Sequence, residues 1–446
     1  MSGRMTLGSL FVLAALIPGL CHAQGGYGYG PATQPGAWQG QPPQTPYPAS
    51  PQYPGCGAPP QGPSNTIYEQ LPDDLGFMHQ DSPLEDALKN LFRHSYYRGE
   101  YLLWSASRPG NVLLGNVPPA GFLQQQPFSP ILNPNTFDVS DPLGNPATAV
   151  EPSLYAFDVK NLSGYRGTAG FNIGPGNFEL SAFVLARRKN EFDGSALMTA
   201  AIPDTPTTIG VPANYIAQSI TIDGAAGTLL YTTGYIAIMQ TSIWGAEANY
   251  ILDAPNAGTG DWWTFSPIAG FRYFNYLESL NQFGGYDYVP DPTQPTTTAQ
   301  ALRSIYSRSN NNVYGPQIGM RAELSISKVT FGAEPKIMLG LNSYTDKMST
   351  LNVNDPALTP NDNTVYNFQK TATVFSPMAD LRAYTRIQVS QYAHVYAAYN
   401  LMWVGSISRP YDTVGYNMLS GGGGMFSPKF TDSIIQGLSV GAELRF

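Results

Sequence analysis

Charged residues are scarce in this chain of 446 residues, where Lys, Arg, Asp and Glu make up 12% of the total. A typical soluble protein has about 25%. Beyond the N-terminal region, no apolar run is long enough to form a membrane-spanning helix, which excludes a helical membrane bundle. The net charge of -8 argues against a nucleic-acid-binding protein.

Cysteine and histidine are almost absent. The two cysteines, Cys21 and Cys56, supply neither a disulfide scaffold nor a Cys-based zinc cluster. Beyond residue 23 the only histidines are His79, His94 and His394. No serine lies in a nucleophile elbow of the G-x-S-x-G kind, because the pattern at 437–441 falls within the alternating C-terminal segment. A Ser-His-Asp hydrolase is therefore disfavoured. We expect a protein that is not an enzyme, with no catalytic residue, cofactor or metal.

Tyrosine, glycine and proline are abundant, with 28, 46 and 39 copies respectively. Aromatic residues favour strands, whereas glycine and proline favour turns and irregular loops. This composition indicates an all-β fold.

The first residues have the pattern of a secretory signal peptide. Arg4 precedes an apolar run at 7–17, and residues 21–23 place small side chains near a cleavage site before Gln24. A lipoprotein acylated at Cys21 is the alternative, although leucine rather than a small residue precedes that cysteine. We expect residues 1–23 to be removed on export.

Residues 24–80 are predicted to form a disordered tail. The segment 24–66 contains 11 Pro and 9 Gly and no charged residue, so it cannot form a packed core. The tail is either a spacer or a contact with cell-wall polymer through its tyrosines. Within residues 81–95, the capping box at 82–85 predicts a short amphipathic helix, either at the membrane surface or inside a barrel.

From Tyr96 onward apolar and polar residues alternate. In the last segment Leu438, Val440 and Leu444 alternate with polar and charged side chains, and the chain ends on Phe446. A soluble sandwich would pack the apolar face on a second sheet, whereas a membrane barrel turns it to lipid and the polar face to the lumen. The terminal aromatic residue favours the barrel.

Ten alternating segments are present, at 96–105, 161–173, 176–188, 241–252, 263–278, 312–326, 328–341, 373–387, 391–404 and the C-terminus. Long connections at 106–160, 189–240, 279–311, 342–372 and 405–430 alternate with short ones near 174–175, 253–262, 327 and 387–390. Long external loops and short periplasmic turns are typical of outer-membrane barrels. We predict a transmembrane antiparallel β-barrel of 10–12 strands over residues 96–446, because 228–239 could add a strand.

The alternation places nine basic and eight acidic side chains on the lumen face. They are Arg98, Glu100, Arg166, Glu179, Arg187, Glu247, Arg272, Glu278, Arg321, Glu323, Glu334, Lys336, Asp380, Arg382, Arg386, Glu443 and Arg445. Such a balanced set could pair across the lumen or act as a selectivity filter. About eight strands leave a filled interior and 16 to 18 leave an aqueous channel, so ten predict a narrow or closed pore.

Several motifs resemble a known family over residues 96–446. They are EYLLW at 100–104, AGFRY at 269–273 with ESL at 278–280, VYGPQIG at 313–319, YN at 399–400 followed by SRP at 408–410, and the closing 437–446. Their identity and order are similar to those of the seventh family of putative beta-barrel porins, known chiefly from planctomycete genomes. The resemblance implies an outer-membrane barrel with porin function and no established functional residues.

We therefore expect an outer-membrane porin that forms a narrow passive channel for ions or small solutes. The alternative is a non-conducting structural or adhesive barrel whose external loops or Pro-rich tail bind partners. The expected contacts are outer-membrane lipid, the barrel-assembly machinery through the strand ending at Phe446, and cell-wall polymer through the tail.

Overall fold

The computed structural model describes residues 95–110, 112–116, 135–140, 146–198, 213–253, 262–288, 290, 299–353, 365–419 and 425–446. The signal peptide, the tail and the amphipathic helix predicted within residues 1–95 lie outside the described residues, except for Ser95. Among those residues, no helix has the length and apolar character needed to cross a bilayer.

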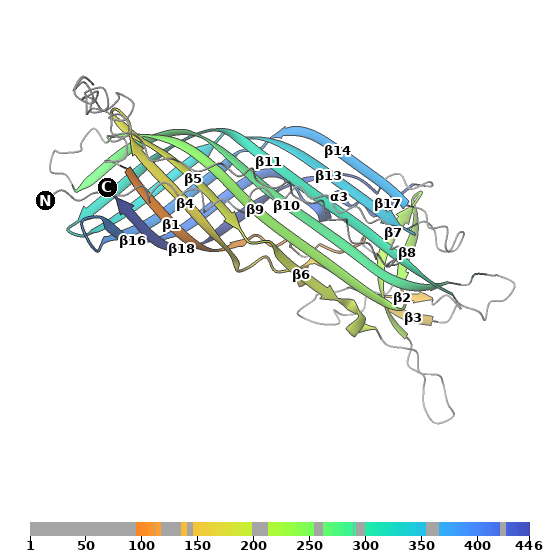
Figure 1. Cartoon of the computed structure of the whole chain (residues 1–446). Helices are drawn as coiled ribbons and strands as arrows, with labels where there is room; N and C mark the ends of the chain where they lie inside the picture. Colours follow the sequence, from red (N-terminus) through yellow and green to blue (C-terminus); the bar gives the residue numbers. More distant parts are fainter. Residues whose placement is uncertain are drawn as a thin grey trace, which may run out of the picture. The chain divides into compact units, whose positions relative to one another are not determined.

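Ten strands form a closed antiparallel ring (Figure 1). In chain order they are β1 (Ser95–Ala106), β4 (Leu162–Asn172), β5 (Gly176–Leu185), β9 (Gly234–Leu252), β10 (Trp263–Tyr288), β11 (Ala299–Ile326), β12 (Val329–Met338), β15 (Met378–Gln388), β16 (Ala393–Ser408) and β18 (Phe430–Arg445). Pairing of β10 with β11 and of β1 with β18 closes the ring. The predicted barrel and its ten segments are confirmed.

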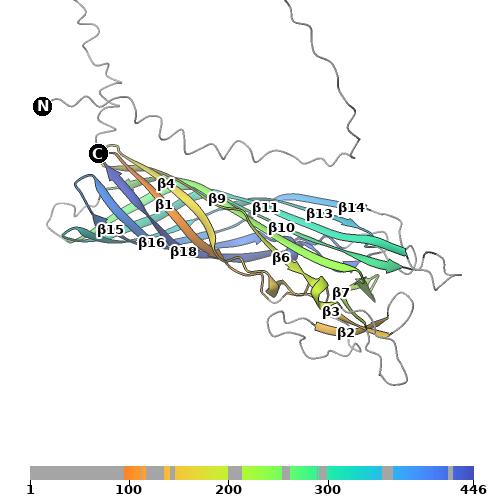
Figure 2. The ribbon, with the colours of Figure 1, turned by 60° about the horizontal axis from the view of Figure 1, so that its bottom comes forward.

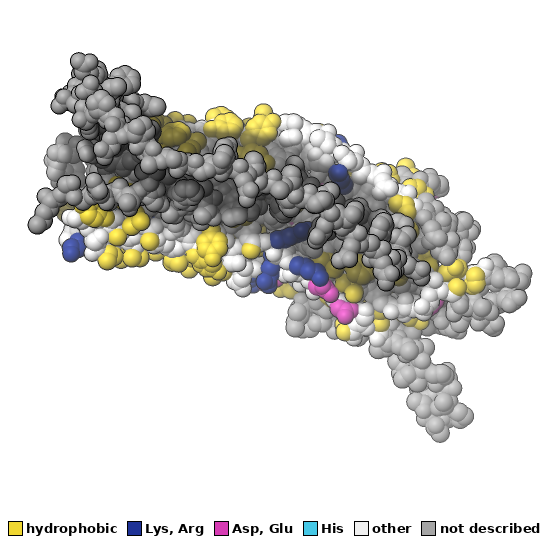
Figure 3. Space-filling model, in the orientation of Figure 1, with side chains coloured by type: hydrophobic (Ala, Val, Ile, Leu, Met, Phe, Trp, Pro, Cys, Tyr) yellow, Lys and Arg dark blue, Asp and Glu magenta, His cyan; other side chains and the backbone are white. Residues whose placement is uncertain are grey.

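The last strand, β18, shows how the sequence builds the wall. Leu438, Val440 and Leu444 are about half exposed on the outer surface, whereas Ser439 and Glu443 are buried inside. Successive side chains of a strand point to opposite faces, so alternation in sequence separates an apolar exterior from a polar interior. Figure 3 shows the resulting apolar surface on one face of the barrel.

The short connections lie at one end, together with the start of β1 and the C-terminus (Figure 1). Two of them turn through left-handed backbone, at Gly174 (φ 64°) and at Ser327 (φ 57°). The strand ends that border the long connections lie at the opposite end, so the predicted alternation of short and long connections is also present.

The long connections are not simple loops. β10 and β11 continue as a paired hairpin to Tyr288 and Ala299, through most of the connection predicted at 279–311. β12 is prolonged by β13 (Leu341–Leu351), β15 is preceded by β14 (Val365–Phe375), and β5 is prolonged by β6 (Arg188–Asp193). The sequence of these extensions shows no clear alternation of apolar and polar residues, because polar residues such as Asn281 and Asn310 occupy the outer face beyond the apolar belt.

A second sheet lies at the end with the long connections (Figure 2). It contains β2 (Asn135–Ser140), β3 (Pro146–Glu151), β7 (Ala213–Ile222), β8 (Ala225–Tyr231) and β17 (Asn417–Met418). β7 runs parallel to both β3 and β17, so three different long connections build the sheet. The segment 228–239 adds no strand to the ring, because it divides between β8 and the start of β9.

Candidate functional site: the barrel interior

The interior of the ring contains a network of ion pairs. Arg272 on β10 donates from Nε to Glu247 on β9 at 3.1 Å and from Nη2 to Asp380 on β15 at 2.7 Å. Lys336 on β12 lies 3.0 Å from Glu247 and 3.6 Å from Asp380. Because β10 and β15 are not neighbours in the ring, this cluster of four charges crosses the interior.

A second cluster surrounds Glu100 on β1, whose side chain is fully buried. Its carboxylate lies 3.0 Å from Arg98, 3.8 Å from Arg166 and 3.2 Å from Arg382, and it accepts a hydrogen bond from Ser439 at 2.7 Å. Three guanidinium groups converge on one carboxylate, and adjacent acids balance them: Glu443 lies 3.1 Å from Arg98 and Glu334 lies 3.8 Å from Arg382.

A third set of pairs fills the end near the short turns. Arg321 on β11 joins Glu179 on β5 at 2.9 Å and Glu334 on β12 at 2.6 Å. Arg386 joins Glu323 at 3.4 Å and Glu443 at 3.8 Å. Aromatic rings complete the packing: Arg98 lies over the ring of Tyr396 at 4.5 Å, and Arg166 lies over that of Trp104 at 5.0 Å.

Two of the seventeen predicted residues lie elsewhere. Arg187 is exposed on the outside and donates to the side chain of Gln240, because β5 ends at Leu185 and the alternation does not continue past it. Arg445, at the end of β18, keeps 42% of its side chain exposed while it bonds to Glu443 at 2.7 Å. The other fifteen lie inside, and each contributes to an ion pair.

Glu278 has a partner from outside the ring strands. Arg409 directly follows β16 and opens the helical turn α3 (Pro410–Thr413). Its guanidinium binds both carboxylate oxygens of Glu278, from Nε at 2.8 Å and from Nη2 at 2.7 Å. Both side chains are at most 1% exposed. This bidentate pair holds the segment after β16 inside the barrel.

Further polar contacts fix the same segment. The hydroxyl of Ser307 on β11 donates to the carbonyl of Pro410 at 2.7 Å. The side chain of Asn311 bonds to both backbone groups of Ser408 at 2.8 Å, and the hydroxyl of Ser408 donates to Asp346 at 2.7 Å. The segment is therefore bonded to two strands of the wall as well as to Glu278.

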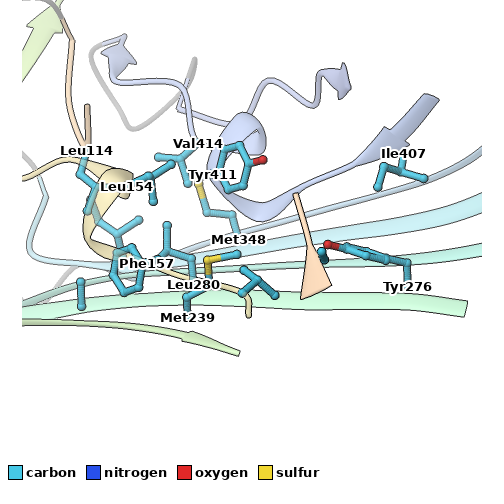
Figure 4. Close-up of a cluster of buried hydrophobic side chains, with 14 of the residues drawn as sticks. Leu114, Leu154, Phe157, Met239, Tyr276, Leu280, Met348, Ile407, Tyr411 and Val414 are labelled. Atoms are coloured by element: carbon cyan, nitrogen blue, oxygen red, sulfur yellow. The ribbon is translucent and has the colours of Figure 1, made fainter. Parts of the chain in front are cut away.

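Apolar side chains seal the space around α3. Tyr411 and Val414 from this segment belong to one buried cluster with Met239, Leu280 and Met348 from the wall. Figure 4 shows these residues converging with side chains of a second inserted segment, Leu114, Leu154 and Phe157. The interior thus has a charged layer toward the short turns and an apolar layer toward the long connections.

Several interior residues were not predicted from the sequence. Arg409, Arg303 and Asp346 lie in segments for which the sequence predicts loops, where no alternation indicates an inward direction. The motif Ser408-Arg409-Pro410 offered one signal, since it places a charge inside a connection that otherwise has few. Across the described residues, no group of three or more His, Cys, Asp or Glu side chains is arranged to hold a metal.

A closed antiparallel ring with an apolar exterior and a charged interior defines a transmembrane β-barrel of the outer-membrane class. The family model described as putative beta barrel porin-7 matches residues 143–446, more than half of the chain. The protein belongs to this family, and the resemblance seen in the sequence is confirmed.

Solved structures similar to this chain include a protease and two transporters. The outer membrane protease OmpT from Escherichia coli is 10% identical, with a TM-score of 0.39, over 80% of this chain and 97% of that one. The P. putida toluene transporter TodX is 6% identical, with a TM-score of 0.20, over 79% and 90%. The Ralstonia pickettii toluene transporter TbuX is 6% identical, with a TM-score of 0.20, over 82% of this chain and 94% of that one. No curated protein matches the chain.

Proposed function

We propose that this protein is an outer-membrane porin that is closed in its resting state. The observation that carries the proposal is the buried bidentate pair between Arg409 and Glu278, which fixes residues 409–414 across the interior. The proposed passage is passive and of narrow bore, and the protein is not an enzyme.

The apolar layer supports a closed resting state. An ion that leaves water without new partners loses its hydration energy, which is far larger than thermal energy. The packed contacts of Tyr411 and Val414 with wall residues such as Met348 offer no such partners. Conduction therefore requires the segment after β16 to move away from the wall, which breaks the pair with Glu278.

A second candidate is a non-conducting barrel that presents its second sheet to partners outside the cell. The charged layer favours this function, because the side chains of Glu100, Glu179 and Glu443 are at most 2% exposed and thus leave little room for solute. For either candidate we propose export with removal of residues 1–23 and assembly through the strand that ends at Phe446.

Single-channel recording in planar bilayers tests the proposal on the full mature chain. The double variant Arg409→Gln with Glu278→Gln removes both charges together, so no unpaired ion remains in the interior. We expect rare openings for the native protein and frequent or sustained openings for the variant. The control is Arg308→Gln, an exposed outward residue, which should behave like the native chain.

Folding of each variant is checked by its altered migration on gels before and after heating. If the folded double variant conducts no more than the native protein, the segment does not close a pore. That result supports the non-conducting barrel and contradicts the porin proposal.

A further inference from the structure

Five exposed basic side chains lie beside the ends of β1, β4 and β5 that border the long connections. We name them the basic rim: Arg108, Lys160, Arg187, Arg188 and Lys189. Three separate parts of the chain supply them, and two backbone bonds bring these parts together. The amide of Ala106 donates to Val159 at 3.0 Å, and that of Ala186 donates to Ser163 at 2.7 Å.

The rim carries more positive charge than its neighbours neutralise. Arg108 and Lys160 share one acid, Asp158, at 3.0 and 3.1 Å. Lys189 lies 2.7 Å from Glu191, in an exposed pair. Exposed ion pairs of this kind contribute little binding free energy, so an anion with more charge can displace both acids from the basic side chains.

Two of the rim's three arginines, Arg187 and Arg188, have no acidic partner in the part of the chain that the structure describes. Arg187 bonds to the neutral side chain of Gln240, and Arg188 forms no ion pair there. Against two acids, five basic groups leave a local excess of positive charge in a chain whose net charge is -8. This excess points to an anionic ligand.

The rim lies one membrane crossing away from the short turns. β5 has ten residues, and its outward Leu180 and Val184 are exposed as expected for a lipid-facing surface. A tilted strand of about nine to eleven residues spans the apolar core of a bilayer. Arg187 follows directly after that crossing, while Arg108 and Lys160 flank the same ends of β1 and β4.

Figure 3 shows basic side chains over the start of β6, beside the apolar surface. Phosphate groups of membrane lipids lie at this boundary between apolar core and water. Guanidinium groups bind phosphate oxygens through two parallel hydrogen bonds, and lysines add charge at a distance. We propose that the basic rim binds the phosphate groups of a lipid in the outer leaflet of the membrane.

Binding of lipid A with two phosphate monoesters tests the proposal. The full mature chain is titrated in neutral detergent micelles, and bound lipid is counted by native mass spectrometry. We expect Arg187→Glu with Arg188→Glu to weaken binding at least tenfold. Raising NaCl from 50 to 200 mM should weaken the native complex, because salt screens exposed charges.

The matched control reverses two other exposed basic residues, Arg308→Glu with Lys347→Glu, which lie opposite each other on β11 and β13. This control should bind lipid A as the native chain does. Equal affinity of the rim variant and the native protein, or an equal loss in the control, overturns the proposal.

Two further arms separate the sources of phosphate and guard against misfolding. Inorganic phosphate at 10 mM should not displace the lipid; complete displacement would assign the rim to free phosphate and contradict lipid binding. If the charge-reversed variant does not fold, Arg187→Gln with Arg188→Gln replaces it, with a smaller but measurable loss expected. Unchanged affinity in that variant, together with no salt effect on the native chain, also overturns the proposal.

Discussion

Several interior arginines, such as Arg98, Arg272 and Arg382, pair with carboxylates from more than one strand. Arg272 is the clearest case, since it joins Glu247 on the neighbouring strand β9 and Asp380 on β15, which is not its neighbour in the ring. Burying a charge without a partner costs several kcal/mol, whereas a buried pair with good geometry roughly offsets that cost. The main effect of these pairs is therefore to specify which strands come together, and their net contribution to stability is small.

Replacing Arg272 by Ala should destabilise the barrel by about 3 kcal/mol. The range for removing one partner of a buried pair is about 3 to 5 kcal/mol, and Lys336 still contacts both carboxylates here. Chemical unfolding in detergent measures the loss. Arg308→Ala, on the outer surface, is the control and should change stability by less than about 0.5 kcal/mol. Equal stability of both variants would show that the interior is wet and screened.

Glu151 in the second sheet is a buried carboxyl that forms no ion pair with any described residue. Its oxygens accept from the backbone amide of Ser219 at 2.9 Å and from the hydroxyl of the same residue at 3.5 Å. Burial raises the pKa of Glu151 from its ordinary value of 4.5 to about 8, and the two hydrogen bonds from Ser219 oppose that rise only in part.

The pKa of Glu151 predicts that the second sheet is more stable in acid. Between pH 4.5 and 8 the folded sheet holds a proton that the unfolded chain has released, so stability falls as the pH rises and is level above 8. The slope should reach about 1.4 kcal/mol per pH unit. Glu151→Gln should flatten this dependence, as measured by hydrogen exchange of β7 amides after correction for intrinsic rates. Exposed Glu191→Gln should keep the native slope.

At the scale of strands, the sequence was informative wherever lipid contacts one face. All ten ring strands follow from alternation, because an apolar exterior opposite a polar interior leaves a period of two. The extensions of β10 and β11 have polar residues on the outer face, such as Asn281 and Asn310, and apolar residues on the inner face, such as Leu280. Further polar residues interrupt the apolar positions, so no regular alternation is visible in the sequence. That pattern also fits a loop.

The inserted turn α3 could not be predicted for a different reason. Its four residues are too few to show helical periodicity, and its position depends on Glu278, Ser307 and Asn311, which are about 100 or more residues away in the chain. For the ion pairs of the interior, the sequence predicted the balance of acidic and basic side chains but not the individual pairs. Which partners pair depends on how the ring closes, and one sequence does not contain that register.

The seam between the first and last strands gives a prediction for the C-terminal residue. The amide of Phe446 donates to Ser95 at 3.0 Å, and its ring meets that of Tyr97 edge-on at 6.1 Å. Deleting Phe446 removes both contacts where the ring closes, so we expect a severalfold lower yield of folded barrel in the outer membrane. Phe446→Tyr keeps the aromatic ring and should assemble normally. An unchanged yield after the deletion would contradict the proposed role in assembly.

The whole barrel is asymmetric along its axis. One end has short turns, whereas the other carries the extended strands, the apolar layer and the second sheet. Long connections of outer-membrane barrels face the outside, and short turns face the periplasm. This orientation would place the basic rim at the outer leaflet, so the inference about lipid phosphate and the topology can be checked against each other.

Labelling of single cysteines in intact cells tests the orientation. The background is Cys56→Ser, which removes the cysteine predicted to remain after export. Ala225→Cys places a thiol at the exposed first residue of β8, next to its turn with β7, and Lys328→Cys places one at the turn between β11 and β12. Both positions are exposed, so a difference in labelling reports on access and not on burial. A membrane-impermeant maleimide should modify the cysteine at 225 in intact cells and the one at 328 only after the outer membrane is opened. The reverse order would mean that the second sheet faces the periplasm, and the basic rim would then lie at the inner leaflet, where diphosphorylated outer-leaflet lipid cannot reach it.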